Sequence, residues 1–372
     1  MAVLHLFNPE NDLALAANEP HYTPRANAAR LADAGALLPA WWADGDGVVC
    51  ASGSRDEDVL YLEGMFGLKC RPYEPARDKI GGCSVWGWSR YAKEKLKGMG
   101  IAESLLPTDD VLDRYRCLSN RALSVAINGY IANNGDGLVL PPPAIVTNSV
   151  EDVLRYVKET ENRAYIKSPW SSSGRGVFPT NAMSALTLRT QAEGIIRRQG
   201  TVTVERALDK VLDFAALYDC SAGEARFVGW SVFDTFDRCA YLGNIVARQG
   251  YLEEYIAARL SRPDELLLMR DIQKKAIDSL VAPEYDGVLG VDMMIYKDKT
   301  GANTIAPCVE VNLRRTMGMV AMSIAERLSV AEPALFKVEY GSGKALDKNA
   351  NEVDILLPSN GFRFVLSGFT GA

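Results

Sequence analysis

A lysine that ends a short apolar strand, followed by a loop of serines and glycines, most constrains how this chain can fold. The segment spans residues 164–177, with Lys167 closing the strand. Glycine lacks a Cβ, so the backbone N–H groups of such a loop can approach a phosphate closely. A Walker A loop carries its Lys after the glycines and a Rossmann fingerprint opens a helix, whereas here the Lys comes first. The order indicates a different phosphate-binding loop, with a solvated Ser/Gly turn as the alternative.

Two apolar segments near the end of the chain each carry charged or amide side chains where a buried strand is expected. Residues 287–296 hold Asp292 at their centre, and residues 307–315 hold Glu310 and Asn312. Side chains two apart on a strand share a face, so Glu310 and Asn312 point the same way. An antiparallel pairing across the turn at residues 297–303 would bring Asp292 to them. Carboxylate and amide oxygens suit Mg²⁺ that bridges nucleotide phosphates, and a buried pair between Glu310 and an arginine is the alternative.

The order and spacing of four motifs resemble the ATP-grasp superfamily, which includes D-alanine ligase and biotin carboxylase. They are the Lys before the Gly-rich loop, Val-Glu-Arg-Ala-Leu at 204–208, Gly-Val-Asp at 290–292 and Glu-Val-Asn-Leu-Arg at 310–314. The resemblance covers about residues 119–328. It implies an ATP-grasp fold of α+β subdomains, preceded by an N-terminal parallel αβ domain of the α/β type. The implied domains are 1–118 (the N-terminal domain), 119–163 with 209–372 (the core with the metal-binding sheet) and 164–208 (the lid).

The resemblance also assigns roles by position. Lys167 resembles the lysine that meets the α and β phosphates, and Arg314 resembles the arginine that faces the transferring phosphoryl group. Asp213 stands near the position of a ribose-binding Glu. The family often has a second phosphate-binding lysine on an earlier helix, where this chain has Arg121; a solvated arginine at a helix start is the alternative.

Three further sets of residues follow from the same resemblance. The phosphate-covering loop is implied to contain Ser172, Ser173, Gly174 and Gly176. The adenine edge is implied to meet Glu205, Arg206 and Leu208. The metal ligands are implied to be Asp292, Glu310 and Asn312.

The function that the resemblance implies is an ATP- and Mg²⁺-dependent ligase. It would activate a small-molecule carboxylate as an acyl phosphate and join it to an amine, with two metal ions and Mn²⁺ as a substitute for Mg²⁺. Such catalysis is mostly positioning and charge neutralisation, which agrees with a chain that has only 2 histidines. A phosphotransferase on the same fold and a non-catalytic nucleotide-binding regulatory protein are the alternatives.

The N-terminal part alternates strands and helices, which is typical of a parallel αβ layer. Its first expected strand, residues 3–7, runs directly into Asn-Pro-Glu-Asn-Asp at 8–12. Ligands of open parallel sheets bind at the carboxyl ends of strands, so Glu10 and Asp12 are candidate substrate contacts. A helix cap with an Asx turn is the alternative for this loop. Arg248, which opens a later loop, is a third candidate, with an exposed loop charge as its alternative.

Composition narrows the function further. The net charge of −6 argues against a sequence-independent nucleic-acid binder. The 7 cysteines form no C-x-x-C pair, which favours a reducing cytoplasm. The chain shows neither a signal-peptide pattern nor an apolar run of about 18 residues, so no membrane partner is expected. The oligomeric state is open and includes a homodimer.

Overall fold

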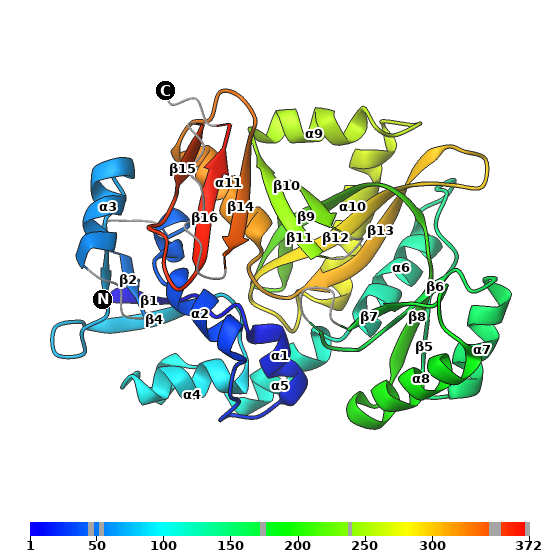
Figure 1. Cartoon of the computed structure of the whole chain (residues 1–372), viewed down its shortest axis with the longest axis horizontal. Helices are drawn as coiled ribbons and strands as arrows, with labels where there is room; N and C mark the ends of the chain where they lie inside the picture. The colour runs from blue at the N-terminus through cyan, green and yellow to red at the C-terminus, as the bar shows by residue number, and fades with distance from the viewer. Residues whose placement is uncertain (44–47, 52–55, 172–175, 237–239, 342–350, 369–372) are drawn as a thin grey trace. The chain divides into compact units, whose positions relative to one another are not determined.

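The structure is a computed structural model, and it describes residues 1–43, 48–51, 56–171, 176–236, 240–341 and 351–368 (Figure 1). The chain divides into two compact units. The first unit comprises Met1–Asp113, Leu242–Leu252 and Arg314–Ala372, and the second comprises Arg114–Tyr241 and Glu253–Leu313.

The N-terminal part of the first unit is a parallel four-stranded sheet in the order β3-β2-β1-β4. The strands are β1 (Ala2–Leu6), β2 (Val48–Cys50), β3 (Cys70–Pro72) and β4 (Ile80–Val85). Its helices are α1 (Asn11–Ala17), α2 (Ala26–Ala34), α3 (Asp56–Phe66) and α4 (Arg90–Gly98), with short 3₁₀ turns η1 (Leu38–Trp41) and η2 (Glu103–Leu105). Leu4, Val49 and Leu96 belong to its apolar core. The predicted parallel αβ layer is confirmed.

The C-terminal part of the first unit adds an antiparallel set of strands and one helix. They are β11 (Ala240–Val246), β14 (Ala334–Tyr340), β15 (Glu352–Asp354), β16 (Phe362–Ser367) and α11 (Met317–Arg327). Phe336 and Phe364 of this set share one buried core with Trp41 and Phe7 from the N-terminal part. Apolar burial of this kind is the main stabilising term in folding, so the two sequence-distant parts form one unit.

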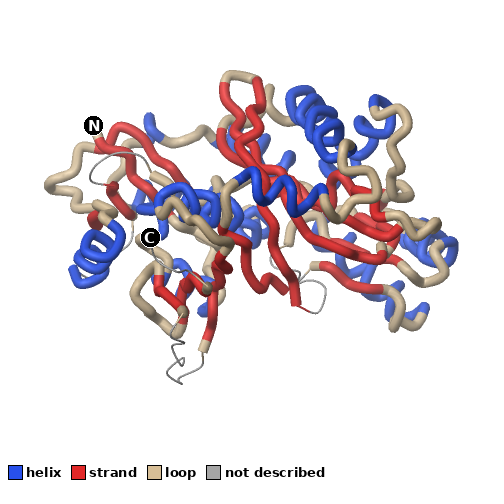
Figure 2. The backbone as a smooth tube through the Cα atoms, turned by 90° about the horizontal axis from the view of Figure 1, so that it is seen from above, coloured by secondary structure: helices blue, strands red, loops and turns tan. Residues whose placement is uncertain are grey.

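The larger sheet of the second unit is antiparallel, in the order β13-β12-β9-β10. Its strands are β9 (Asp209–Ser221), β10 (Glu224–Phe236), β12 (Gly287–Lys297) and β13 (Asn303–Asn312). The helices wholly or partly in this unit include α5 (Asp109–Leu118), α6 (Ala122–Asn134), α9 (Gln249–Ala257) and α10 (Glu265–Leu280). Tyr218 of β9 donates from its hydroxyl to Gln273 Oε1 at 2.8 Å, which ties α10 to the sheet. Strands and the helices along them are coloured by type in Figure 2.

The smaller sheet of the second unit is also antiparallel, in the order β5-β8-β6-β7. It contains β5 (Ile145–Thr147), β6 (Ala164–Lys167), β7 (Val177–Pro179) and β8 (Val202–Arg206), with helices α7 (Val150–Glu159) and α8 (Ala185–Gln199) (Figure 1). Ser149 caps α7, because its Oγ accepts from the backbone N–H of Asp152 at 3.3 Å. Val153 of α7, Ile166 of β6 and Ala192 of α8 share one core.

The two units group the chain differently from the three predicted domains. Residues 314–372 belong with the N-terminal part, and not with the strands that carry Asp292 and Glu310. The small sheet begins at Ile145, before the lower bound of 164 that we expected for the lid. The separate lid of residues 164–208 therefore stays a prediction.

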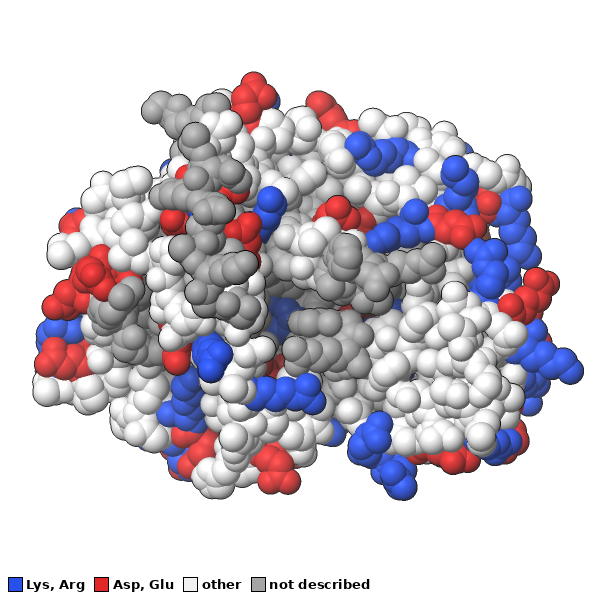
Figure 3. Space-filling model, in the orientation of Figure 1, with Lys and Arg blue, Asp and Glu red and all other residues white. Residues whose placement is uncertain are grey.

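The surface carries charges of both signs, interspersed among uncharged residues on the face that Figure 3 shows. In the part of the chain that the structure describes, no helix is both long and apolar enough to cross a membrane.

Candidate functional site

Strands β12 and β13 bring the predicted metal ligands together. They pair antiparallel with Asp292 directly opposite Glu310 and Gly290 opposite Asn312. Asn312 Nδ2 donates to Asp292 Oδ2 at 2.9 Å. The turn between the strands is closed by Asp298 Oδ1, which accepts from the backbone N–H of Thr300 at 2.8 Å. The predicted antiparallel pairing and the approach of Asp292 to Asn312 are confirmed.

Small residues surround the two carboxylates on this face of the sheet. Ala215 of β9 lies opposite Asp292, and Ser231 of β10 lies opposite Ala215, so a row runs from Ser231 to Glu310 across four strands. Directly paired residues of an antiparallel sheet share a face, whereas Val291, next to Asp292, points to the other side and is fully buried. The residues beside Asp292 along this row therefore have short side chains.

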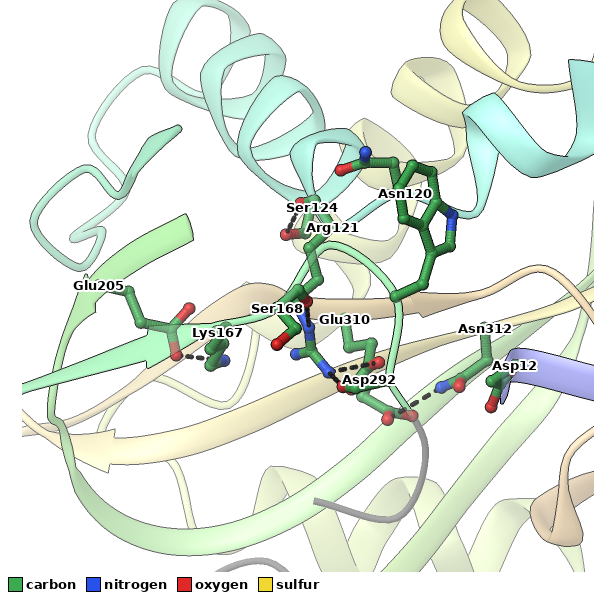
Figure 4. Close-up of polar contacts among 12 residues, drawn as sticks. Asp12, Asn120, Arg121, Ser124, Lys167, Ser168, Glu205, Asp292, Glu310 and Asn312 are labelled. Atoms are coloured by element: carbon green, nitrogen blue, oxygen red, sulfur yellow. Dashed lines mark hydrogen bonds and ion pairs between the residues drawn. The ribbon is translucent and has the colours of Figure 1, made fainter. Parts of the chain in front are cut away.

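Arg121, at the start of α6, contacts both the loop after β6 and Glu310 (Figure 4). Its guanidinium donates to Ser168 O at 3.1 Å, to Ser171 Oγ at 3.0 Å and to Glu310 Oε1 at 2.8 Å. The Arg121 side chain is 5% exposed and that of Glu310 is 30% exposed. The alternative of a solvated Arg121 is therefore wrong, while the alternative of an ion pair between Glu310 and an arginine is present in the structure.

The side-chain oxygen atoms of Asp292, Glu310 and Asn312 fit Mg²⁺. Two carboxylates and the Asn312 amide oxygen are hard ligands, and Mg²⁺ typically takes one or two carboxylates together with water and substrate phosphates. Asn312 donates from Nδ2 to Asp292, so its Oδ1 is the atom that could face a cation. Among the described residues, no group of three or more His, Cys, Asp or Glu side chains is arranged to hold a metal alone. A cation here would therefore need oxygen atoms from a ligand.

Lys167 ends β6 with a side chain that is only 6% exposed, and it forms an ion pair with Glu205 of β8 (Figure 4). The pairing of Tyr165 with Glu205 and of Lys167 with Thr203 puts all four side chains on one face of the small sheet. A buried ammonium needs a counter-charge, and Glu205 supplies it. The structure thus brings together two residues to which the resemblance gave separate roles.

The charges of both groups affect the pKa of the Cys308 thiol. Burial raises the pKa of this thiol, and the charges of Asp292, Lys167, Glu205 and Glu310 act on the same group. The carboxylates of the large sheet and the Lys167–Glu205 pair therefore lie within electrostatic range of one thiol. That thiol stays protonated and acts as a small apolar side chain.

The base of the Gly-rich loop is held closed, although Ser172, Ser173 and Gly174 lie outside the described residues. The Ser168 N–H donates to Gly176 O at 2.8 Å. A Cβ on Gly176 would lie 2.3 Å from Ser171 Cβ, so only glycine fits there. The close approach of these loop ends requires Gly176 for space.

Trp170 anchors the same loop, and sequence reasoning assigned it no role. Its indole Nε1 donates to Arg116 O at 3.0 Å, its backbone N–H donates to Gln199 Oε1 at 3.0 Å, and the Arg116 guanidinium lies 3.9 Å from the ring centroid. A tryptophan is an unusual residue in a solvated Ser/Gly-rich turn. Its presence in the sequence was the signal that this loop packs against the protein.

The other predicted nucleotide contacts lie on neighbouring strands. Arg206 ends β8 opposite Ala164, and Leu208 follows it. Asp213 of β9 lies on the same sheet face as Ala215 and Asp292; its Oδ2 accepts from Lys210 Nζ at 2.6 Å and from Thr235 Oγ1 at 2.9 Å. Their roles toward a nucleotide stay predictions.

The remaining candidates lie in the first unit. Arg314 donates from Nε to Asp12 Oδ1 at 2.8 Å and from Nη2 to Asp12 Oδ2 at 2.7 Å. Glu10 is 2% exposed, and burial raises the pKa of its carboxyl group. Arg248 is exposed just before α9. The two carboxylate oxygens of Asp12 bind one edge of the Arg314 guanidinium in a bidentate contact, which is a positioning geometry.

Comparison with known proteins gives likeness of fold alone. No family profile matches the sequence, and no curated protein matches it. Among solved structures, biotin carboxylase from Campylobacter jejuni, in its β-γ-ATP complex, is similar with a TM-score of 0.53 at 11% identity, covering 98% of this chain and 86% of that one.

Two further solved structures have lower scores. Phosphoribosylamine–glycine ligase from Thermotoga maritima has a TM-score of 0.49 at 14% identity, covering 98% of this chain and 92% of that one. N5-carboxyaminoimidazole synthase from Aspergillus clavatus, in complex with ADP and 5-aminoimidazole ribonucleotide, has a TM-score of 0.48 at 11% identity, covering 88% of this chain and 94% of that one. The conclusion on the fold rests on the biotin carboxylase structure.

Proposed function

Because the chain has the ATP-grasp fold, we propose that it is an ATP- and Mg²⁺-dependent ligase that joins a carboxylate to an amine. The observation that carries the proposal is the Asp292, Glu310 and Asn312 group on adjacent strands, with Arg121 connecting it to the base of the Gly-rich loop. A structural ion pair alone would not need the second carboxylate and the amide beside it.

ATP would be held between the small sheet and the carboxylate-bearing sheet of the second unit. Lys167 and Arg121 carry positive charges at the base of the loop, and both are buried, where charges act on phosphate more strongly than in water. Each is paired with a carboxylate, Lys167 with Glu205 and Arg121 with Glu310. Nucleotide phosphates would compete with these carboxylates for the two cations.

Asp292, Glu310 and Asn312 would hold Mg²⁺. The bound ion would neutralise charge on the phosphate oxygens during transfer. Arg121 engages Glu310 at Oε1 and thereby fixes the orientation of this carboxylate. The exposed part of Glu310 is the part available to a cation.

The reaction would run in two displacements. A substrate carboxylate oxygen attacks the γ-phosphorus of ATP, the bond to the bridging oxygen breaks, and ADP leaves with that electron pair. The amine nitrogen then attacks the acyl carbon, phosphate leaves, and the nitrogen loses a proton. Neither step uses a protein nucleophile, so the chain's task is to position the reactants and neutralise charge. Arg314, clamped by Asp12, would face the transferring phosphoryl group.

The substrates would be small molecules, and the reaction would take place in the cytoplasm. The six cysteines that the structure describes are unpaired, which supports a reducing compartment.

The test is phosphate release by the wild type with ATP, Mg²⁺ and pools of carboxylates and amines, followed by mass analysis of the product. A ligase releases free phosphate and forms an amide, whereas a kinase leaves the phosphoryl group on its substrate. Glu310→Gln is nearly isosteric and is expected to abolish phosphate release. The exposed Glu224 offers a matched control, because Glu224→Gln should release phosphate at the wild-type rate. Normal release by Glu310→Gln would refute the metal assignment.

A further inference from the structure

The parallel sheet of the first unit has a topological switch point between β1 and β4. The chain passes from β1 to β2 and β3 on one side and then returns to pair β4 with the other side of β1. The loops after β1 and β4 leave the carboxyl ends of adjacent parallel strands, and open α/β sheets bind ligands in the crevice at that edge. The loops in question are residues 7–10, after β1, and residues 86–89, after β4.

These two loops are fixed to each other by Asn8. Its Nδ2 donates to Gly87 O at 2.8 Å, and its Oδ1 accepts from the Gly87 N–H at 3.3 Å. Asn8 is fully buried. The alternative of a local Asx turn and helix cap is wrong for this loop, because Asn8 bonds to a residue 79 positions away and Glu10, at the N-cap of α1, makes no capping hydrogen bond.

Gly87 allows Asn11 to reach into the crevice. A Cβ at residue 87 would lie 2.3 Å from Asn11 Nδ2 and 3.1 Å from Arg314 Cβ. The Asn11 amide and the start of the Arg314 side chain therefore pass close to a bare backbone. Glycine is the residue that permits this approach.

Among the residues that the structure describes, the polar atoms at this point have no hydrogen-bond partner. Asn11 is 1% exposed, and neither its Nδ2 nor its Oδ1 has a partner. Glu10, the preceding residue, is 2% exposed, and its Oε2 also has none. Buried polar groups are nearly always satisfied, so such a cluster calls for a partner outside the chain. Apolar side chains would serve the fold better at both positions.

The unpartnered atoms define the chemistry of the missing partner. Glu10 Oε2 and Asn11 Oδ1 accept hydrogen bonds, and Asn11 Nδ2 donates one. The charges of Lys95 and Asp33 act on the Glu10 carboxyl with opposite signs. Both carboxylate oxygens of Asp12 accept hydrogen bonds from Arg314, so Asp12 is not part of this unpartnered set. A primary ammonium has the donors and the charge that this set lacks, and an adjacent oxygen on the same molecule would take the Asn11 N–H.

We infer that the crevice between β1 and β4 binds an amino acid, whose ammonium group is held by Glu10 and Asn11. The inference rests on the proposed ligase function, in which this amino acid is the amine substrate. Asn11 also donates to an oxygen of the bound molecule.

The test is calorimetric titration of the full chain with each standard amino acid, with and without Mg²⁺ and ADP. The N-acetyl forms serve as probes that lack the ammonium. At least one free amino acid is expected to bind, with its N-acetyl form at least about tenfold weaker. Glu10→Gln and Asn11→Ala should each weaken binding about tenfold or more. Glu19→Gln and Asn27→Ala change exposed residues of the same types and should bind as the wild type does.

The outcomes separate this inference from the ligase proposal. Glu310→Gln is expected to bind the amino acid normally while releasing no phosphate. Binding that is lost in Glu10→Gln and Asn11→Ala supports the crevice even where no amide product forms, and the missing product then counts against the ligase. No binding by the wild type under either condition, or equal binding by the N-acetyl forms, would overturn the inference. Unchanged affinity in both variants would overturn it as well.

Discussion

Replacing Arg121 with Met should destabilise the second unit and should do so through Glu310. The substitution keeps most of the length of the side chain but removes the donors to Ser168 O, Ser171 Oγ and Glu310 Oε1. It also leaves the Glu310 carboxylate without its buried counter-charge. The loop after β6 loses its connection to β13 at the same time.

The size of the expected destabilisation follows from the burial of the Arg121 and Glu310 side chains. Removing one partner of a fully buried ion pair costs about 3–5 kcal/mol. Arg121 is nearly fully buried, but the Glu310 side chain is 30% exposed, so water would partly solvate the remaining charge. The lower end, about 3 kcal/mol of the free energy of unfolding, is therefore expected. For a unit of this size, that corresponds to a Tm lower by about 6–12 °C.

The assay is thermal and urea unfolding of four proteins without nucleotide: the wild type, Arg121→Met, Glu310→Gln and the double variant. Glu310→Gln removes the unpaired charge, so the double variant should be more stable than the sum of the single changes predicts, by at least about 1 kcal/mol. Arg121→Lys retains the positive charge but lacks the planar guanidinium with its several donors. Its free energy of unfolding should lie between those of the wild type and Arg121→Met. A loss below about 1 kcal/mol in Arg121→Met, or additive effects in the double variant, would refute this reasoning.

Three further outcomes are expected. Gly176→Ala should destabilise the protein by about 1–3 kcal/mol in thermal unfolding, because the new Cβ would meet Ser171. Adding Ser171→Gly should recover part of the lost stability, and no recovery would contradict the steric explanation. Asp12→Asn should lower the rate of phosphate release about 10–100-fold, because Arg314 would be held less firmly. The free energy of unfolding should fall by about 1 kcal/mol or less, because both side chains are partly exposed. An unchanged rate would count against the positioning role. Chelation of divalent cations should stop phosphate release and added Mg²⁺ should restore it, so turnover that persists in excess chelator would count against a metal at the carboxylates.

The parts of the fold that depend on local pattern could be predicted from the sequence. The alternation of β12 and β13 and the short turn between them predicted that Asp292, Glu310 and Asn312 share a face, and the structure confirms it.

Contacts between distant parts of the chain could not be predicted in the same way. Arg121 meets Glu310 across 189 positions, and Arg314 meets Asp12 across 302 positions. Charged residues at such separations have many potential partners, and only tertiary packing selects one. Strand β4 contains two glycines, and its pairing with β1 overrides their low β propensity.

The two compact units group the chain differently from the predicted domains for a related reason. The Glu-Val-Asn-Leu-Arg motif looks continuous, yet the boundary between the compact units falls directly before Arg314. The core formed by Phe336, Phe364 and Trp41 places the C-terminal strands with the N-terminal part. Such long-range apolar contacts leave no mark in local periodicity.

The most direct test of the central claim is thermal unfolding of the wild type and of Lys167→Ala, each with and without Mg²⁺-ATP. A ligand at ~100 times its Kd adds about 2.7 kcal/mol to the stability of the native state. The proposed ATP site predicts a rise in the Tm of the wild type that needs Mg²⁺ and disappears in Lys167→Ala. The absence of any rise, or an equal rise in both proteins, would contradict it.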